Sequence, residues 1–236
     1  MENTNFLNLQ PSAGGSFSYG WRKMFEKAFL PLLVAVIIAG ILDGPSLGAN
    51  WKWDGDGFDW PVIFMIPLAL FGMAYAFLFM PIIKYGERKL FLNAMRDEEA
   101  DLKVLFEGFK TQYLNIVLAN LIVFALAAVG FVMLIVPGII VVCRLVFVPF
   151  LVMDKNMEAM KAVEKSWQMT RGYGWTIFGM GIISFFVFIA GLILCFVGAI
   201  FSLMWIHSAF ATFYAIISAQ NNDDNPIPIL GVNEEK

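Results

Sequence analysis

Long apolar runs separated by short polar segments dominate the chain. A bilayer's hydrocarbon core is about 30 Å thick, and a helix needs roughly 20 apolar residues to cross it. Such runs occur at 24–42, 61–83, 114–136, 139–153, 175–196 and 199–218. This pattern predicts an all-α, polytopic integral membrane protein with six transmembrane helices. The fourth run is short, so we expect it to begin directly at a turn formed by Pro137 and Gly138.

The connections between these runs are unequal in length. Little more than Pro137 and Gly138 joins the third and fourth runs, and the region around Val197 and Gly198 joins the fifth and sixth. Short connections make consecutive helices antiparallel neighbours. We therefore expect three antiparallel hairpins in one transmembrane domain, residues 17–218. A disordered tail at 1–16 precedes it, and a cytoplasmic tail at 219–236 follows it.

The distribution of lysine and arginine predicts the orientation, because cytoplasmic loops of membrane proteins carry an excess of both. With the N-terminus inside, Lys52 alone lies outside and Arg144 lies within a span. All other basic residues are then cytoplasmic: Arg22, Lys23, Lys27, Lys84, Arg88, Lys89, Arg96, Lys103, Lys110, Lys155, Lys161, Lys165, Arg171 and Lys236. Both termini are expected on the cytoplasmic side.

Composition supports a membrane protein and argues against most enzyme classes. Of 236 residues 59% are apolar and 15% charged, whereas soluble domains have about 25% charged residues. A single histidine excludes a multi-histidine metal centre made by this chain alone. The predicted spans contain no aspartate or glutamate in their interiors, and neither a nucleophile elbow nor a phosphate-binding loop is present. We expect no catalytic site, metal, cofactor or nucleic-acid partner.

Two inner segments, 84–113 and 154–173, have helical patterns. In the second, Met157, Met160, Val163 and Trp167 share one helix face, and Asn156 is placed to cap the N-terminus. An amphipathic helix of this kind is typical of the membrane interface. A helix packed against a cytoplasmic neighbour explains the pattern equally well.

Three polar residues inside the predicted spans are candidates for ligand or lipid contact. Arg144 is costly in a membrane unless it finds water, a partner or the interface, so it indicates either an anion contact or a snorkelling side chain. His207 is a candidate proton relay, or a neutral histidine that hydrogen-bonds a neighbouring helix. Asn120 is typical of interhelical hydrogen bonding. Gly179, Gly181, Gly191 and Gly198 indicate close packing between helices.

From Leu105 onward the chain resembles a group of bacterial membrane families. These are the membrane domain attached to some glycerophosphoryl diester phosphodiesterases, and stand-alone YciC-like proteins. The shared features are a Pro-Gly pair, an arginine, a second proline, an aspartate at the inner end of the span and, after a helix with a serine, an Arg-Gly pair. In this chain they are Pro137, Gly138, Arg144, Pro149, Asp154, Ser166, Arg171 and Gly172.

The resemblance implies an inner-membrane protein concerned with envelope or lipid homeostasis, and it carries over no catalytic residues. We therefore expect a non-enzymatic module of the inner membrane that engages lipid or a partner protein, with membrane lipids, a second membrane protein or another copy of the chain as partners. The alternative is a channel or transporter for a small molecule, ion or lipid that uses Arg144 and His207. A polar cavity would favour the alternative, and grooves open only to lipid would favour the first.

Overall fold

The structure is a computed structural model that describes residues 11–26, 29–47, 67, 70–193 and 195–220. All regular structure in these ranges is helical. The helices are α1 (Ala13–Glu26), α2 (Phe29–Leu47), a π-helical turn (Tyr75–Phe79), α4 (Met80–Met95), α5 (Val104–Thr111), α6 (Tyr113–Met133), α7 (Ile135–Leu145), α8 (Val148–Lys155), α9 (Ala159–Met169), α10 (Gly174–Ile193) and α11 (Cys195–Gln220).

Four helical stretches in the described part are long and apolar enough to cross a bilayer. They are Tyr113–Met133, Ile135–Lys155, Gly174–Ile193 and Gly198–Gln220, which match the last four runs of the sequence. A fifth would result if α1 and α2, bent by 104° relative to each other, formed one span. The described residues leave out 61–66 and 68–69 of the run at 61–83, and 48–60 of the loop at 43–60. The chain is thus an all-helical, multi-pass membrane protein, and a total of six spans stays a prediction.

The turn between α6 and α7 lies earlier than the sequence predicts. Leu134 alone has extended backbone, whereas Pro137 and Gly138 belong to the first turn of α7. Proline is tolerated there because the first amide groups of a helix have no partner within the helix. Gly138 has a packing role instead, since a Cβ atom there would lie 2.5 Å from the ring of Phe131.

Helix α1 begins within the segment that the sequence predicts as a tail. Ser12 caps it, because its Oγ accepts a hydrogen bond from the Gly15 amide at 3.2 Å. The helix crosses α11 closely at Gly20, where a Cβ atom would lie 2.9 Å from the amide nitrogen of Ala209. The indole of Trp205 donates to the carbonyl of Phe17 at 2.8 Å. This contact ties the first helix to the last.

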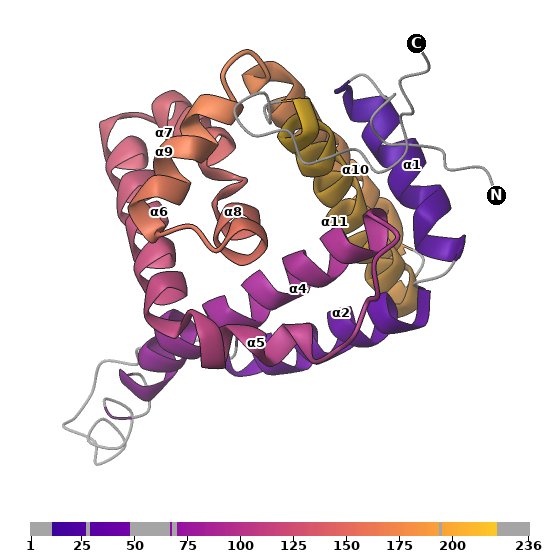
Figure 1. The fold of residues 1–236 in the computed structure, drawn as a ribbon, viewed down its shortest axis with the longest axis horizontal. Coiled ribbons are helices and arrows are strands. Elements are labelled where there is room, and N and C mark those ends of the chain that lie inside the picture. The colour runs from indigo at the N-terminus through magenta and orange to yellow at the C-terminus, as the bar shows by residue number, and fades with distance from the viewer. Residues whose placement is uncertain (1–10, 27–28, 48–66, 68–69, 194, 221–236) are drawn as a thin grey trace, which may run out of the picture.

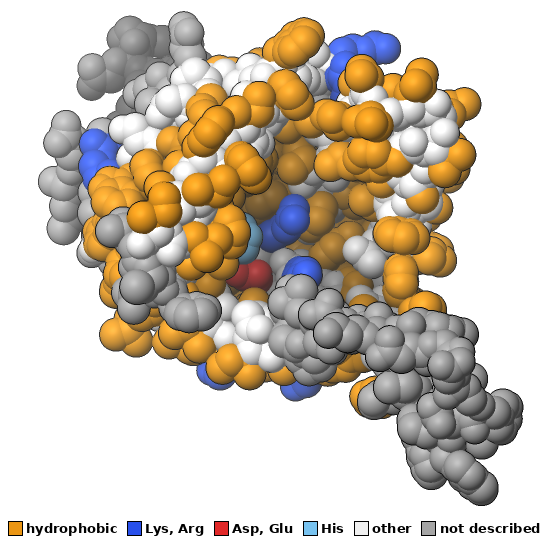
Figure 2. All heavy atoms as spheres, turned by 180° about the vertical axis from the view of Figure 1, so that it is seen from behind, with side chains coloured by type: hydrophobic (Ala, Val, Ile, Leu, Met, Phe, Trp, Pro, Cys, Tyr) orange, Lys and Arg blue, Asp and Glu red, His pale blue; other side chains and the backbone are white. Residues whose placement is uncertain are grey.

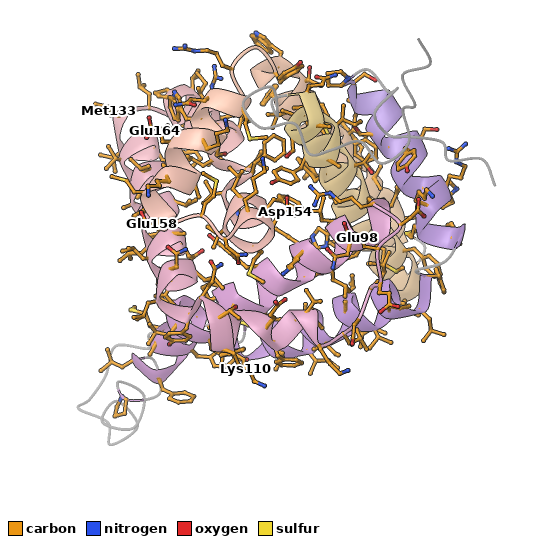
Figure 3. All side chains as sticks on the ribbon, viewed as in Figure 1. Glu98, Lys110, Met133, Asp154, Glu158 and Glu164 are labelled. Atoms are coloured by element: carbon orange, nitrogen blue, oxygen red, sulfur yellow. The ribbon has the colours of Figure 1, made fainter. Side chains whose placement is uncertain are left out.

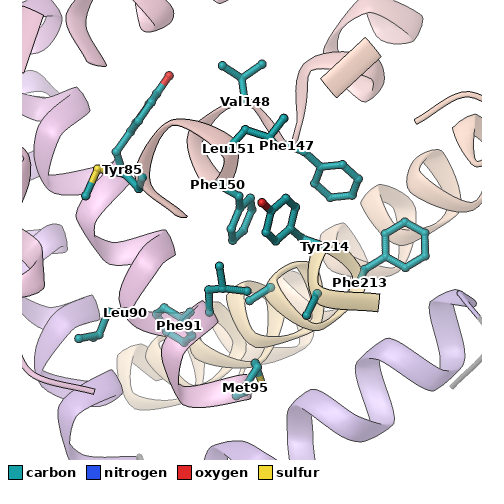
Figure 4. Packing of buried hydrophobic residues seen from close by; sticks show 14 of the residues in the cluster. Tyr85, Leu90, Phe91, Met95, Phe147, Val148, Phe150, Leu151, Phe213 and Tyr214 are labelled. Carbon is teal, nitrogen blue, oxygen red and sulfur yellow. The ribbon is translucent and has the colours of Figure 1, made fainter. Parts of the chain in front are cut away.

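Helix α4 occupies the middle of the molecule, between α6, α7 and α9 on one side and α10, α11 and α1 on the other (Figure 1). Its apolar side chains pack with α8 and α11 to form the core (Figure 4). The rings of Phe150 and Tyr214 stack there at 4.9 Å. The sequence ends the second apolar run at residue 83 and assigns 84–113 to a cytoplasmic segment, so α4 extends across that boundary. In the structure the apolar positions are buried, and the charged residues share one face.

Helix α9 differs from its predicted form at the N-terminus. Asn156 does not cap it but ends α8 with a left-handed backbone (φ 51°). The cap comes from Asn115 of α6, which accepts from the Ala159 amide and donates to the Met157 carbonyl, both at 2.6 Å. Its small residues are buried against neighbouring helices, whereas Met160 and Trp167 are exposed. Packing on a neighbour is therefore observed, and an interfacial role for the exposed face stays a prediction.

A charged hollow as the candidate functional site

Figure 2 shows a hollow in the face opposite to that of Figure 1. Hydrophobic side chains form its rim, and basic, acidic and histidine side chains lie on its floor. The chain has one histidine, His207, on α11. The contacts of His207 therefore identify the helices that build the floor.

One face of α4 borders the histidine on this floor. Lys84, Glu87, Arg88 and Phe91 follow the i, i+3, i+4, i+7 spacing that places residues on the same side of a helix. Two of them touch His207: the Phe91 ring lies 5.3 Å from the imidazole, and Glu87 Oε1 lies 3.1 Å from Nδ1. This face of α4 is thus turned toward α11.

Glu87 and His207 form a pair in a largely dry environment. The Glu87 side chain is 6% exposed and that of His207 is 31% exposed. The two atoms are close, but they are not aligned for a hydrogen bond. The pair can hold α4 against α11.

Arg88 adds a positive charge next to this pair. Its guanidinium donates to the Val146 carbonyl at 3.3 Å and lies 5.8 Å from the Phe150 ring. Burial lowers the pKa of Arg88, while Tyr85 and Glu87 oppose that effect. Arginine is the most basic side chain, and it remains charged in proteins. Lys84 lies one turn away with an exposed side chain. The face of α4 that carries Lys84, Glu87 and Arg88 therefore has two cations and one carboxylate, and this arrangement attracts anions.

The three predicted contact residues do not form one site. The Arg144 guanidinium lies 5.8 Å from the ring of Trp167 on α9, and its buried Nη1 has no hydrogen-bond partner among the described residues. Asn120 is half-buried on α6, with no side-chain hydrogen bond to the described part of the chain. Neither residue contacts His207 there. Ligand roles for Arg144 and Asn120 stay predictions, and the structure instead groups His207 with Glu87.

The residues behind the family resemblance have mainly structural positions. Pro149 lies in the first turn of α8, and Gly172 has a left-handed backbone (φ 92°), which glycine adopts without strain. Arg171 is exposed. Hydroxyl groups of Ser166 and Thr170 donate to the Arg144 carbonyl at 2.8 and 3.3 Å, which binds α9 to the end of α7.

Asp154 forms a second polar cluster near the centre of the molecule (Figure 3). Its carboxylate accepts two hydrogen bonds from Arg96, at 2.5 and 2.9 Å, and one from the Tyr214 hydroxyl at 3.0 Å. Burial lowers the pKa of Arg96, but the hydrogen bond and charge of Asp154 outweigh it and raise the pKa. The cluster joins the C-terminal end of α4 to α8 and α11. Its polar groups satisfy one another's hydrogen bonds, which indicates a structural role for the cluster.

Glu87 is the residue that sequence reasoning missed. Its helical spacing with Lys84, Arg88 and Phe91 is visible in the sequence, but it fits a solvated loop helix equally well. What identifies Glu87 is its burial beside His207, and these two residues lie far apart along the chain. No group of three histidine, cysteine, aspartate or glutamate side chains suited to a metal occurs among the described residues.

The long apolar helices and the charged hollow define the class: an all-helical, multi-pass membrane protein with a polar site enclosed by apolar walls. Comparison with models of protein families, with curated proteins and with solved structures finds no match for the chain. The family resemblance of its second half therefore stays a prediction that rests on the sequence motifs alone.

Proposed function

We propose that the protein is a non-enzymatic module of the inner membrane that binds an anionic lipid in the hollow, with both chain ends on the cytoplasmic side. The observation that carries the proposal is the combination of a cationic floor and an apolar rim (Figure 2). An anionic lipid has the same two parts, a charged head group and apolar chains. The Lys84 and Arg88 side chains would bind its phosphate, and the rim would contact its chains.

A second cavity supports a lipid ligand. It has a volume of about 450 Å³ and lies between α1, α10 and α11. It is lined by Trp21, Val187, Ala190, Gly191, Gly198, Phe201, Ser202 and Trp205. Its polar groups already have partners, because the Ser202 hydroxyl bonds to the Val187 and Gly198 carbonyls and the Trp205 indole bonds to Phe17. Such a cavity fits hydrocarbon, which needs no hydrogen bonds.

Native mass spectrometry of gently extracted protein tests the proposal. We expect retention of added phosphatidylglycerol in preference to phosphatidylcholine, and about a tenfold weaker affinity, ~1.4 kcal/mol, in Arg88→Gln. Lys84→Gln is expected to weaken binding as well, and to leave folding unchanged because its side chain is exposed.

The matched control is Lys103→Gln, which removes the same charge from a side chain that is 92% exposed. It should leave lipid retention unchanged. Equal retention of the two lipids by the native protein, or equal loss in all three variants, would contradict lipid binding in the hollow.

Transport is the second candidate, and the buried contact between Glu87 and His207 favours it. A carboxylate and an imidazole only 3.1 Å apart inside a membrane protein are typical of proton pathways. If the hollow is a transport path, protein in liposomes should carry protons or anions down a gradient, and Glu87→Gln should abolish that flux. Selective lipid retention without any flux would leave the binding module as the function.

A further inference from the structure

The two hairpins formed by α6 with α7 and by α10 with α11 have wholly apolar tips. From Leu121 to Cys143, and again from Phe185 to Phe201, no charged, hydroxyl, amide or indole side chain occurs. The tip side chains are also exposed, with Val132 at 87% and Ile193 at 79%. A turn in water usually exposes polar residues such as asparagine, aspartate or serine beside its glycine and proline. Here each turn and its surroundings are as apolar as the helices.

Residues that mark a membrane interface gather near the basic ends of these hairpins and are absent from their tips. Tyr113, Trp167 and Trp175 lie near the basic ends, beside Lys110, Lys165 and Arg171. A helix that meets both interfaces usually carries tryptophan and tyrosine at both ends. The tips carry neither. The hairpins thus have the composition of segments that meet one interface.

The directions of the helices limit how deep they can reach. The N-terminal ends of α6 and α10 both follow basic segments, so positive-inside placement puts both on one side. Across Figure 1, however, α6 runs upward and α10 runs downward. If both helices enter the membrane from the same side, their opposite directions across this view mean that they are tilted from the membrane normal. A helix of 21 residues is about 31 Å long, so strong tilt leaves its tip short of the far interface.

At the break between α6 and α7, the extended residue has partners for both of its backbone polar groups. The Leu134 amide donates to the Gly130 carbonyl, and the Leu134 carbonyl accepts from the Gly138 amide, both at 3.2 Å. Pro137 has no amide hydrogen. Irregular backbone is excluded from lipid mainly because unpaired amide groups are costly there. At this turn the protein itself satisfies the polar groups of the extended residue.

We propose that both hairpins enter the membrane from the basic side and end inside the hydrocarbon core, where lipid chains surround their tips. The chain then crosses the bilayer fewer times than its apolar helices suggest. The protein then occupies more volume in the leaflet on the basic side than in the opposite leaflet. The number of basic residues on each side does not distinguish spanning hairpins from hairpins that end in the core. In both cases the chain returns to the side from which it entered. This placement does not depend on lipid binding in the hollow.

Depth measurement by spin labelling tests the placement. In a Cys143→Ala, Cys195→Ala background, a nitroxide is attached to Met133→Cys, at the end of α6 remote from Lys110 (Figure 3), or to Ile193→Cys. In liposomes, both labels should collide readily with oxygen and hardly with a water-soluble nickel chelate, as labels near the bilayer centre do. A label depth at the far head groups, or ready collision with the chelate, would overturn the proposal.

Lys103→Cys is the control for sidedness, because its side chain is 92% exposed beside the basic segments. A membrane-impermeant maleimide should label it from the inner side alone. Labelling from the outer side would show that the basic segments lie outside, with the depth of the tips unchanged. Neither result depends on which lipid the protein retains.

The unmodified protein provides a second measurement if the cysteine-free variant does not fold. A phospholipid with a diazirine at its chain end should label the segment 132–136, as mapped by mass spectrometry. A phospholipid with the diazirine in its head group should not. Labelling of this segment by the head-group probe would show that the tip lies at an interface.

Discussion

Asp154→Asn is expected to lower the free energy of unfolding by about 2–4 kcal/mol. The substitution keeps the shape of the side chain but removes the charge that faces the Arg96 guanidinium and one of the acceptor oxygens. Removing one partner of a buried pair leaves the other charge without compensation, and this cost exceeds the net value of the pair. The Arg96 side chain is 22% exposed and that of Asp154 is 14% exposed, so some solvent remains to reduce the loss.

Thermal and denaturant unfolding in detergent, followed by circular dichroism, would measure this loss. Glu158→Gln is the control, because Glu158 is 73% exposed in its pair with Lys161. Such a surface change is expected to stay within about 0.5 kcal/mol. Adding Arg96→Met to Asp154→Asn should recover part of the stability, since the unpaired charge is then absent. Equal stability of Asp154→Asn and Glu158→Gln would show that the cluster does not hold the core together.

Gly86→Ala is expected to destabilise the protein by about 1–3 kcal/mol. Alanine favours a helix over glycine by about 1 kcal/mol, so helix propensity alone predicts the opposite sign. A Cβ atom at position 86 would, however, lie 2.6 Å from the Leu105 carbonyl oxygen and 2.8 Å from that of Val104. These are backbone atoms, and they can move away only if α5 shifts from α4. The same unfolding measurements would report the change.

Gly181→Ala is the matched control on α10. No heavy atom lies within 4 Å of the Cβ position there, so the substitution should be neutral or stabilising by up to about 1 kcal/mol. If Gly86→Ala proved as stable as Gly181→Ala, the close approach of α4 and α5 would not be a constraint on the fold.

The sequence predicted the lipid-facing helices better than the buried one. Four apolar runs became four helical stretches of spanning length, because a continuous apolar run has few alternatives to a helix in a membrane. Helix α4 was missed as a central element because its burial depends on helices far away in the chain. Charged residues on one face hid its apolar face, and only the packed structure distinguishes a core helix from a loop helix.

The candidate site was predicted in part for the same reason. The cost of a polar side chain in a membrane identified His207, but not Glu87, which lies outside the predicted spans. Among glycines, Gly191 does pack closely, with a Cβ position 2.0 Å from the Ser202 hydroxyl, whereas Gly179 and Gly181 face open space. Gly86 was not identified. The sequence shows which residues are small and which are unfavourable in a membrane. The fold determines which of them contact another helix.

The contact between α1 and α11 has a consequence for the order of synthesis. Phe17 and Trp205 are bonded across 188 positions of the chain. At 5–20 residues per second, ribosomes need roughly 10–40 s to make that length. Throughout this interval the face of α1 that later covers α11 has no binding site, and Gly20 has no backbone to approach. The N-terminal helix is therefore among the first segments made and among the last to reach its final position, and a truncation before α11 would leave it permanently without its partner.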